Sequence, residues 1–212
     1  VALHGHARVD LHRLRGLKLQ RGAMEGLMAA SERLFQRRHL RVDDAAGLSS
    51  SQVAMRVRRH APENGTKLVV VDYVQQLREP EAKRGDNKAN CEIALDGLIQ
   101  LARRDGYAML VLSQLSRKCE ERDDKRPIMA DLRETGELEQ AADAILFLYR
   151  DEVYDSETER KGVTDLIIAK NKHGRTGSVE MAWDAACATL RSMSTRREYT
   201  GNASEWRTGA DG

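Results

Sequence analysis

The chain has 212 residues, of which 41% are hydrophobic, 4% are aromatic and 32% are charged. This length suits one large domain, and the hydrophobic fraction is enough for a core built mainly from aliphatic side chains. The charges nearly cancel to a formal net charge of +2. A simple polybasic nucleic-acid binder is therefore excluded, although a local basic patch is not.

Basic residues are concentrated near the beginning of the chain. Residues 1–60 contain 12 Lys and Arg against 5 Asp and Glu. Such a stretch fits either a solvated helical surface or a surface that faces DNA or another partner. The composition alone leaves both interpretations open.

The cysteines and the hydropathy pattern bear on the compartment. Cys91, Cys119 and Cys187 are far apart and form no CxxC pair, which is typical of free thiols in a reducing compartment and not of a metal site. No apolar run approaches the roughly 18 residues of a membrane helix, and no signal peptide is visible. We expect a soluble cytoplasmic protein that does not bind a membrane. Because the chain opens at Val1 inside basic, helix-like sequence, we also expect it to be a piece of a longer polypeptide.

Helical and strand-like patterns alternate along the chain. Helical spacing of apolar residues predicts helices within 10–39, from a cap at Ser49 to about Arg59, and from about Asn87 to near Gly106. Apolar runs predict five buried strands: Leu68–Val71, Met109–Leu112, Ala144–Leu148, Leu166–Ala169 and Ser178–Trp183. The polar residues 194–212 lack any period and predict a disordered tail.

Continuous apolar strands separated by helices indicate an α/β fold with a mostly parallel central sheet flanked by helices. Ligands of such sheets bind beyond the carboxyl ends of the strands. The residues that follow each apolar run are therefore the candidates for chemistry. We expect Asp72, Gln114 and a basic turn at 170–175 to reach one shared edge of the sheet.

Two of these candidates suit a nucleotide. Asp72 follows a buried run, where an acid can hold the water shell of Mg²⁺ beside a nucleotide, or can simply cap a helix or end the strand. Gln114 follows the next run, where a neutral amide can sense a γ-phosphate or orient water, or can merely close a loop by a hydrogen bond. Either residue alone is a weak signal.

Two further segments suit phosphate groups. Asp131–Gln140 contains Gly136, whose freedom allows close backbone approach to a nucleic-acid strand beside Arg133, although the acidic residues also fit a helix start. Lys170–Gly177 is a basic hairpin-like turn that can reach a phosphate in this subunit or a neighbour, or can be a solvated charged turn.

The order of six segments is more specific than any one of them. The segments are Leu68–Gln75, Leu112–Arg117, Lys125–Pro127, Asp131–Gln140, Tyr149–Tyr154 and Lys170–Lys172. In this order they resemble the DnaB family of replicative DNA helicases, from about residue 40 to residue 192. The preceding stretch looks like the helices that follow the nucleotide-binding loop of that family.

The resemblance implies a RecA-like ATPase core over residues 1–193 that works as a homohexameric ring. Such a ring encircles single-stranded DNA, moves 5′ to 3′ and unwinds duplex DNA at the replication fork, using ATP and Mg²⁺. Primase and a helicase loader are the further partners that the resemblance implies.

Carried over from the family, Asp72 would be the acid associated with Mg²⁺ through water, and Gln114 would be the γ-phosphate sensor. Lys170 and Lys172 would reach the γ-phosphate of the neighbouring subunit, with Arg175 close by.

The same carry-over assigns the DNA contact. Arg133, Glu134 and Gly136 would lie on a loop that follows the DNA backbone, mostly through main-chain groups.

The sequence departs from the family pattern at two places. No G-x-x-x-x-G-K-[ST] motif occurs in the 212 residues, and the catalytic glutamate that follows this loop in the family is also missing. Without backbone amides and a lysine around the phosphates, the chain alone should bind ATP poorly and be inactive. The family usually has an arginine where Lys172 stands, and lysine lacks the planar fork that grips two phosphate oxygens. We expect truncation of a longer gene product, with a naturally inactive paralogue as the alternative.

Two other functions remain open from the sequence. A RecA-like regulator or recombination mediator would share the core without processive unwinding, but the Asp131–Gln140 and Tyr149–Tyr154 segments favour the helicases. A non-catalytic DNA-binding or scaffold module would explain the missing phosphate loop.

Overall fold

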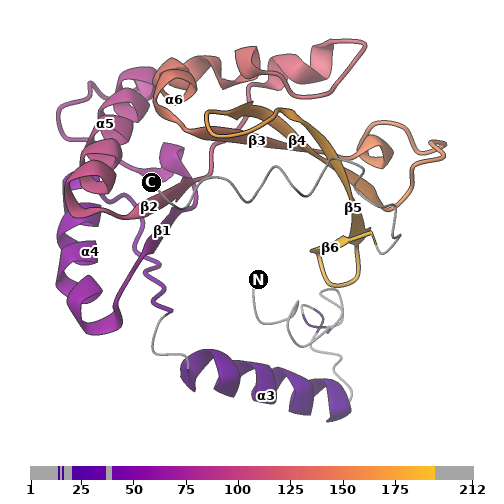
Figure 1. Ribbon diagram of the computed structural model, residues 1–212, viewed down its shortest axis with the longest axis horizontal. Helices are drawn as coiled ribbons and strands as arrows, with labels where there is room; N and C mark the ends of the chain where they lie inside the picture. The colour runs from indigo at the N-terminus through magenta and orange to yellow at the C-terminus, as the bar shows by residue number, and fades with distance from the viewer. Residues whose placement is uncertain (1–13, 15, 17–20, 37–39, 194–212) are drawn as a thin grey trace, which may run out of the picture.

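A computed structural model describes residues 14, 16, 21–36 and 40–193, which form six strands in two sheets together with helices (Figure 1). The predicted tail at 194–212 and most of the basic stretch before residue 21 lie outside the described residues.

The first described helices follow from local capping signals. Helix α3 spans Arg21–Gln36, within the predicted region. Helix α4 spans Ser50–Asn64 and begins at a capping box, in which Ser49 and Gln52 each accept a hydrogen bond from the other's backbone N–H. It extends beyond the predicted end near Arg59, continues through Pro62, and ends where Gly65 adopts a left-handed φ of 60°.

A parallel strand pair forms the first sheet. Strand β1 (Leu68–Val71) pairs with β2 (Ala108–Val111), with Val71 opposite Val111. Helix α5 (Asn87–Asp105) connects them, as a parallel pair requires, because the chain must return to the same end of the sheet. Figure 1 shows α4 and α5 beside this pair.

The second sheet is antiparallel. Its strands are β3 (Ala144–Tyr149), β4 (Val163–Asn171), β5 (Gly177–Asp184) and β6 (Thr189–Ser192), in that order. The five predicted strands are present, and β6 was not predicted. The expected mostly parallel central sheet is not confirmed, because connections without a crossing helix turn each of these strands back on its neighbour.

Short helices occupy several strand ends. The 3₁₀ helix η1 (Val74–Gln76) follows β1, and η2 (Arg117–Glu121) follows β2. A further pair, η3 (Met129–Thr135) and α6 (Gly136–Ala141), leads into β3, which η4 (Asp151–Val153) follows.

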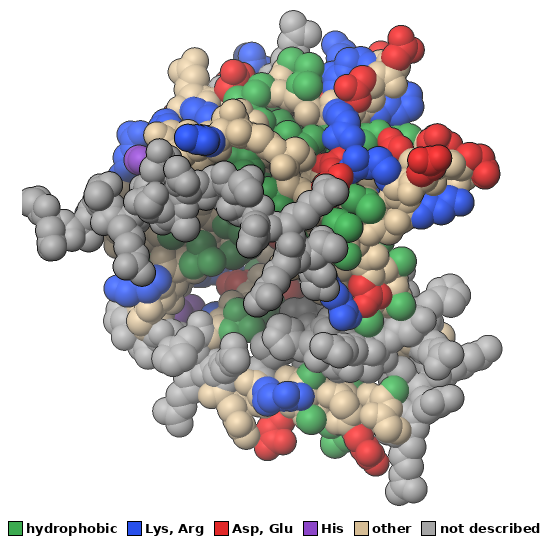
Figure 2. All heavy atoms as spheres, turned by 45° about the vertical axis from the view of Figure 1, so that its right-hand side comes forward, with side chains coloured by type: hydrophobic (Ala, Val, Ile, Leu, Met, Phe, Trp, Pro, Cys, Tyr) green, Lys and Arg blue, Asp and Glu red, His purple; other side chains and the backbone are tan. Residues whose placement is uncertain are grey.

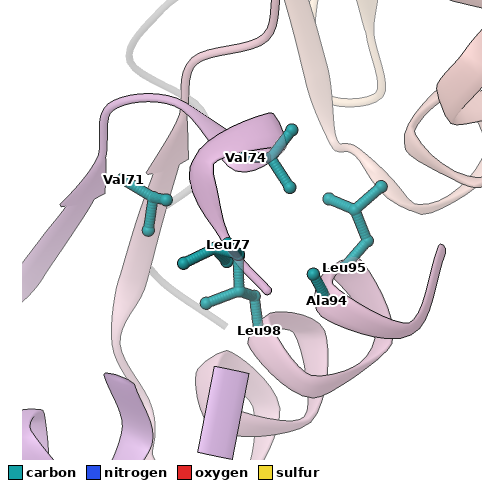
Figure 3. Packing of buried hydrophobic residues seen from close by; sticks show 6 residues of the cluster. All are labelled: Val71, Val74, Leu77, Ala94, Leu95 and Leu98. Atoms are coloured by element: carbon teal, nitrogen blue, oxygen red, sulfur yellow. The ribbon is translucent and has the colours of Figure 1, made fainter. Parts of the chain in front are cut away.

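Two apolar clusters hold these elements together. In the first, Val71, Val74 and Leu77 pack against Ala94, Leu95 and Leu98 of α5 (Figure 3). In the second, Leu132 of η3 packs with Ile145 and Phe147 of β3. Leu138 of α6 packs against the first cluster, so that the η3–α6 segment contacts both.

One face of the strands is apolar but exposed. Leu68, Val70, Leu110, Leu112, Leu146 and Leu148 are between 41% and 55% exposed. The prediction that these strands are buried on both faces is therefore wrong for the described chain, because nothing described covers that face. Figure 2 shows apolar side chains lying among basic and acidic ones on the surface that it presents. Among the described helices, none is both long enough and apolar enough to span a membrane.

The contact between α4 and α5 depends on Gly97. A Cβ added at Gly97 would lie 2.2 Å from Ser50 Oγ and 2.5 Å from Ser50 Cβ, at the buried start of α4. We expect Gly97→Ala to lower the free energy of unfolding by about 1–3 kcal/mol, since overpacking forces the helices apart. Equilibrium urea unfolding measures this change.

Matched variants test the cause. Gly22 lies in α3 with nothing within 4 Å of an added Cβ, so Gly22→Ala should be neutral or stabilising through helix propensity. Ser50→Gly should restore part of the stability lost in Gly97→Ala, because it removes both close atoms. Equal unfolding midpoints for Gly97→Ala and the unchanged chain would rule out the steric explanation.

Candidate nucleotide and DNA site

Asp72 follows β1 directly, where the sequence placed it. Its side chain is exposed and makes no hydrogen bond or ion pair with the described residues. The peptide bond between Asp72 and Tyr73 is cis. The carboxylate is therefore available to a ligand at the carboxyl end of the strand.

Gln75 joins the turn after Asp72 to the Gln114 segment. The Gln114 N–H donates to Gln75 Oε1 at 3.2 Å, and Gln75 Nε2 donates to Ser113 Oγ at 2.9 Å. The main chain adds a bond of 3.0 Å from Val74 N–H to the Leu112 carbonyl. Because the side chain of Gln75 fixes the backbone of Gln114, the exposed amide of Gln114 stands at the same edge as Asp72.

A buried polar network attaches the segment after β1 to helices α5 and α4. Asn90 of α5 donates to the Leu77 carbonyl at 2.9 Å and accepts from Glu79 N–H at 2.8 Å. The Glu79 carboxylate accepts from Ser50 N–H at 2.7 Å at the start of α4. Asn90, Glu79 and Ser50 are all buried, and buried polar groups that have partners fix one arrangement of the chain.

The three residues predicted to contact DNA lie in one continuous helical segment. The backbone of Arg133 and Glu134 lies in η3, and Gly136 begins α6. The predicted open loop is therefore wrong for the backbone, and the helix start that the acidic residues also fitted is what forms. The side chains of 133–137 lie outside the described residues.

An ion pair anchors the beginning of this segment. Arg122 holds the buried Asp131 with two hydrogen bonds, of 2.7 and 2.8 Å, and Asp131 also accepts from Ile128 N–H at 2.8 Å. The hydrogen bond from Arg122 lowers the pKa of Asp131 below its ordinary value. The carboxylate therefore stays charged, and the start of η3 stays fixed.

The basic turn is the predicted hairpin between β4 and β5. Asn171 shapes it, since its Oδ1 accepts from His173 N–H at 3.1 Å and its amide would meet any Cβ at Gly174 at 2.6 Å. Lys172 and Arg175 are exposed, and Lys170 is half-buried.

The two lysines contact α6 and the residue before β3, and not the edge that carries Asp72. Lys170 Nζ donates to the carbonyls of Glu139 and Gln140, and Lys172 Nζ contacts Asp143. Lys170 is paired with Ile145 near the beginning of β3, because β4 runs antiparallel to β3. The expectation of one shared edge for Asp72, Gln114 and this turn is therefore not met within one chain.

The edge at Asp72 fits a hydrated magnesium ion with a nucleotide. Among the described residues, no three His, Cys, Asp or Glu side chains cluster so as to hold a bare metal ion. Mg²⁺ keeps several waters and takes one or two carboxylates together with phosphate oxygens, so a single exposed carboxylate suffices. Asp72 would hold the water shell of the ion, and Gln114 would face the phosphate.

Gln75, Asn90 and Asp143 were not identified as site residues from the sequence. Gln75 and Asn90 carried a detectable signal, since one follows a strand-end acid and the other is a polar residue within the apolar face of α5. Asp143 carried none, because its partner Lys172 lies 29 positions away in the sequence, in the turn after β4.

A family model and several curated proteins are similar to this chain in sequence. A family model described as DnaB-like helicase C terminal domain matches residues 2–192. The replicative DNA helicase DnaB of Haemophilus influenzae is 37% identical over 195 residues, which cover 91% of this chain and 42% of that protein. The replicative DNA helicase DnaC of Bacillus subtilis is 38% identical over 142 residues, 67% of this chain and 31% of that protein. The chain spans less than half the length of these relatives.

Solved structures agree with the sequence relatives. One structure, described as an ATPase domain, superposes with a TM-score of 0.81 at 30% identity, covering 90% of this chain and 68% of that one. A DnaB-like replicative helicase, solved in a study of its interactions with primase, gives a TM-score of 0.82 at 31% identity, covering 90% of this chain and 46% of that one. These likenesses confirm the α/β, RecA-like class of the fold. The chain belongs to the DnaB-like helicase C-terminal domain family.

Proposed function

We propose that this chain forms the motor domain of a replicative DNA helicase that uses ATP and Mg²⁺ to move 5′ to 3′ along single-stranded DNA as a homohexameric ring. The observation that carries the proposal is the connection through Gln75, which keeps Gln114 at the same strand edge as the free carboxylate of Asp72. A carboxylate beside a neutral amide is the pair that a motor needs to hold Mg²⁺ and to sense the γ-phosphate.

Each residue of the edge has a role in this proposal. Asp72 binds Mg²⁺ through water, and Gln114 orients the attacking water and transmits the loss of the γ-phosphate. Lys170, Lys172 and Arg175 serve the site of a neighbouring subunit. Their place near the beginning of β3, away from the Asp72 edge, supports action across a subunit interface.

Arg133, Glu134 and Gly136 are proposed to follow the DNA backbone. Their segment is helical and is anchored at its beginning by the Arg122–Asp131 pair. A backbone that is already ordered loses little conformational entropy on binding. Phosphate contacts of this kind position a strand without reading its sequence, as processive movement demands.

A phosphate loop must be supplied to this edge by another segment, since the 212 residues contain no G-x-x-x-x-G-K-[ST] motif. The exposed apolar face of β1, β2 and β3 supports this view, because strand faces of such composition are normally covered. In the described chain β2 pairs only with β1, and β3 is at the edge of its sheet. A parallel strand between β2 and β3 would join the two sheets into one mixed central sheet.

The partners and the cellular compartment of this protein are proposed from its family. Replicative helicases act on chromosomal DNA, so we place the protein in the cytoplasm. Primase is a proposed partner, supported by the related DnaB-like helicase whose structure is described with its interactions with primase. A helicase loader is proposed as well, because a closed ring must be opened or assembled around its DNA strand.

The absent phosphate loop favours a second candidate, a non-catalytic member of the family that holds DNA or a partner without turnover. The retained Asp72 and Gln114 speak against it, since a pure scaffold has no use for either side chain. ATP turnover by a polypeptide that carries this domain together with a phosphate loop separates the two.

In such a polypeptide, Asp72→Ala should lower ATP turnover by about 100-fold or more while the ring still assembles, because the metal loses its protein anchor. Steady-state hydrolysis and sedimentation measure the two properties. Asp96→Ala, which removes an exposed carboxylate on α5, is the matched control. Near-normal turnover in Asp72→Ala would reject the proposed metal role.

Arg133→Ala combined with Gly136→Ala should weaken binding of an oligo-dT strand by roughly tenfold, since a phosphate contact is lost and a Cβ at Gly136 prevents close approach of the strand to the backbone. Basal ATP hydrolysis should change less than the stimulation by DNA. Fluorescence anisotropy of a labelled oligonucleotide measures the affinity, with Arg103→Ala on the exposed side of α5 as control. A fall in hydrolysis alone, with unchanged DNA affinity, would show that this segment does not bind the strand.

A further inference from the structure

The basic turn is attached to α6 through both of its lysines. Lys170 Nζ lies 2.6 Å from the Glu139 carbonyl and 3.2 Å from the Gln140 carbonyl, in the last turn of α6. Lys172 binds Asp143 twice, with its N–H 2.8 Å from the Asp143 carbonyl and its Nζ 2.9 Å from Asp143 Oδ1. These contacts join residues 29 to 31 positions apart in the sequence.

The two attachments differ in strength. The last carbonyls of a helix have no partner within the helix and carry partial negative charge, so an ammonium group there is bound favourably. The Asp143 and Lys172 side chains are 72% and 43% exposed, so water screens their attraction and the pair is exchangeable. The hydrogen bond from Lys172 is the main cause that lowers the pKa of Asp143, and the charges of His173 and Lys170 add to it. Asp143 therefore remains a carboxylate that holds Lys172 until a stronger anion competes.

Helix α6 continues directly from the segment that carries Arg133 and Glu134. Leu132 packs against β3, and Leu138 packs against the core around α5. A displacement of this segment therefore moves the carbonyls that hold Lys170 and, just beyond α6, the carboxylate that holds Lys172.

We propose that, while the basic turn is not engaged with a neighbouring subunit's nucleotide, Lys170 and Asp143 couple α6 to this turn, so that movement of the DNA-contacting segment changes the reach of Lys172. The functional meaning rests on the proposed helicase activity, which assigns DNA to one segment and phosphate to the other. The mechanical connection itself does not depend on that activity.

Hydrogen exchange of the 212-residue chain without DNA tests the connection. Leu138→Ala loosens α6 from the core around α5. The amides of residues 172–177, in the turn between β4 and β5, should then exchange roughly threefold faster or more, although this turn does not contact Leu138. In a background of Lys170→Met with Asp143→Asn this acceleration should fall by at least half, because only the main-chain bond from Lys172 N–H to the Asp143 carbonyl remains. Lys170→Arg should preserve it, since a guanidinium can donate to the same carbonyls.

Controls separate coupling from general loosening. Lys161→Met removes an exposed lysine near the other end of β4, and Asp96→Asn removes an exposed carboxylate from α5. In both backgrounds Leu138→Ala should still accelerate exchange in the turn. If Leu138→Ala unfolds the whole chain, the milder Leu138→Val takes its place. Unaltered exchange in the turn, or an acceleration that keeps its full size without the Lys170 and Asp143 side-chain contacts, would overturn the proposal.

A second arm adds a saturating oligo-dT strand. In the unchanged chain it should alter exchange at 172–177 by at least about twofold, and this response should be lost with Lys170→Met and Asp143→Asn. A chain that binds no oligo-dT would reject the proposed DNA contact, while the DNA-free arm would still decide the coupling. If oligo-dT binds the unchanged chain and the double variant equally, and alters exchange at 172–177 equally in both, the coupling is contradicted while the DNA contact stands.

Discussion

The parallel register of β1 and β2 is the constraint on which the candidate site depends. Val71 lies opposite Val111, and Leu112 N–H donates to the Val71 carbonyl at 2.9 Å. Both strands therefore end at the same level, and the residues after them leave the sheet together. Gln75 then connects the segment after β1 to the segment after β2 by a hydrogen bond, and buried Asn90 binds the segment after β1 to α5. A slip by one residue would turn Val71 away from the core and carry Asp72 with it.

Local signals made part of this arrangement predictable. An aliphatic run followed by an acid indicates a strand with a polar end, which is why the bounds of Leu68–Val71 and the place of Asp72 directly after it were predicted correctly, although one face of this strand is exposed. Ser49 marks the beginning of α4 because an N-cap side chain acts within a few residues, whereas the predicted end near Arg59 was too early, since the helix continues to Asn64. The hairpin at 170–177 follows from local signals as well, since the turn lies between two apolar runs.

The rest depended on partners that are distant in the sequence. The direction of β4 relative to β3 is set by pairing across the sheet, so the sequence could not show that Lys170 lies near the beginning of β3. The Asp131–Gln140 composition fitted both a loop and a helix start, and packing of Leu132 and Leu138 accompanies the helical form. Gln75 and Asp143 gain their significance from contacts 39 and 29 positions away, and no local pattern encodes these.

The row of aliphatic side chains on β1, β2 and β3 has a practical consequence for handling the protein. Leucine and valine side chains that are half exposed beside open strand edges form a template on which other chains can add by cross-strand pairing. Folded material made from these 212 residues should therefore self-associate as its concentration rises. A segment that covers this face should keep the protein monodisperse at the same concentration, a difference visible by size-exclusion chromatography before any enzymatic assay.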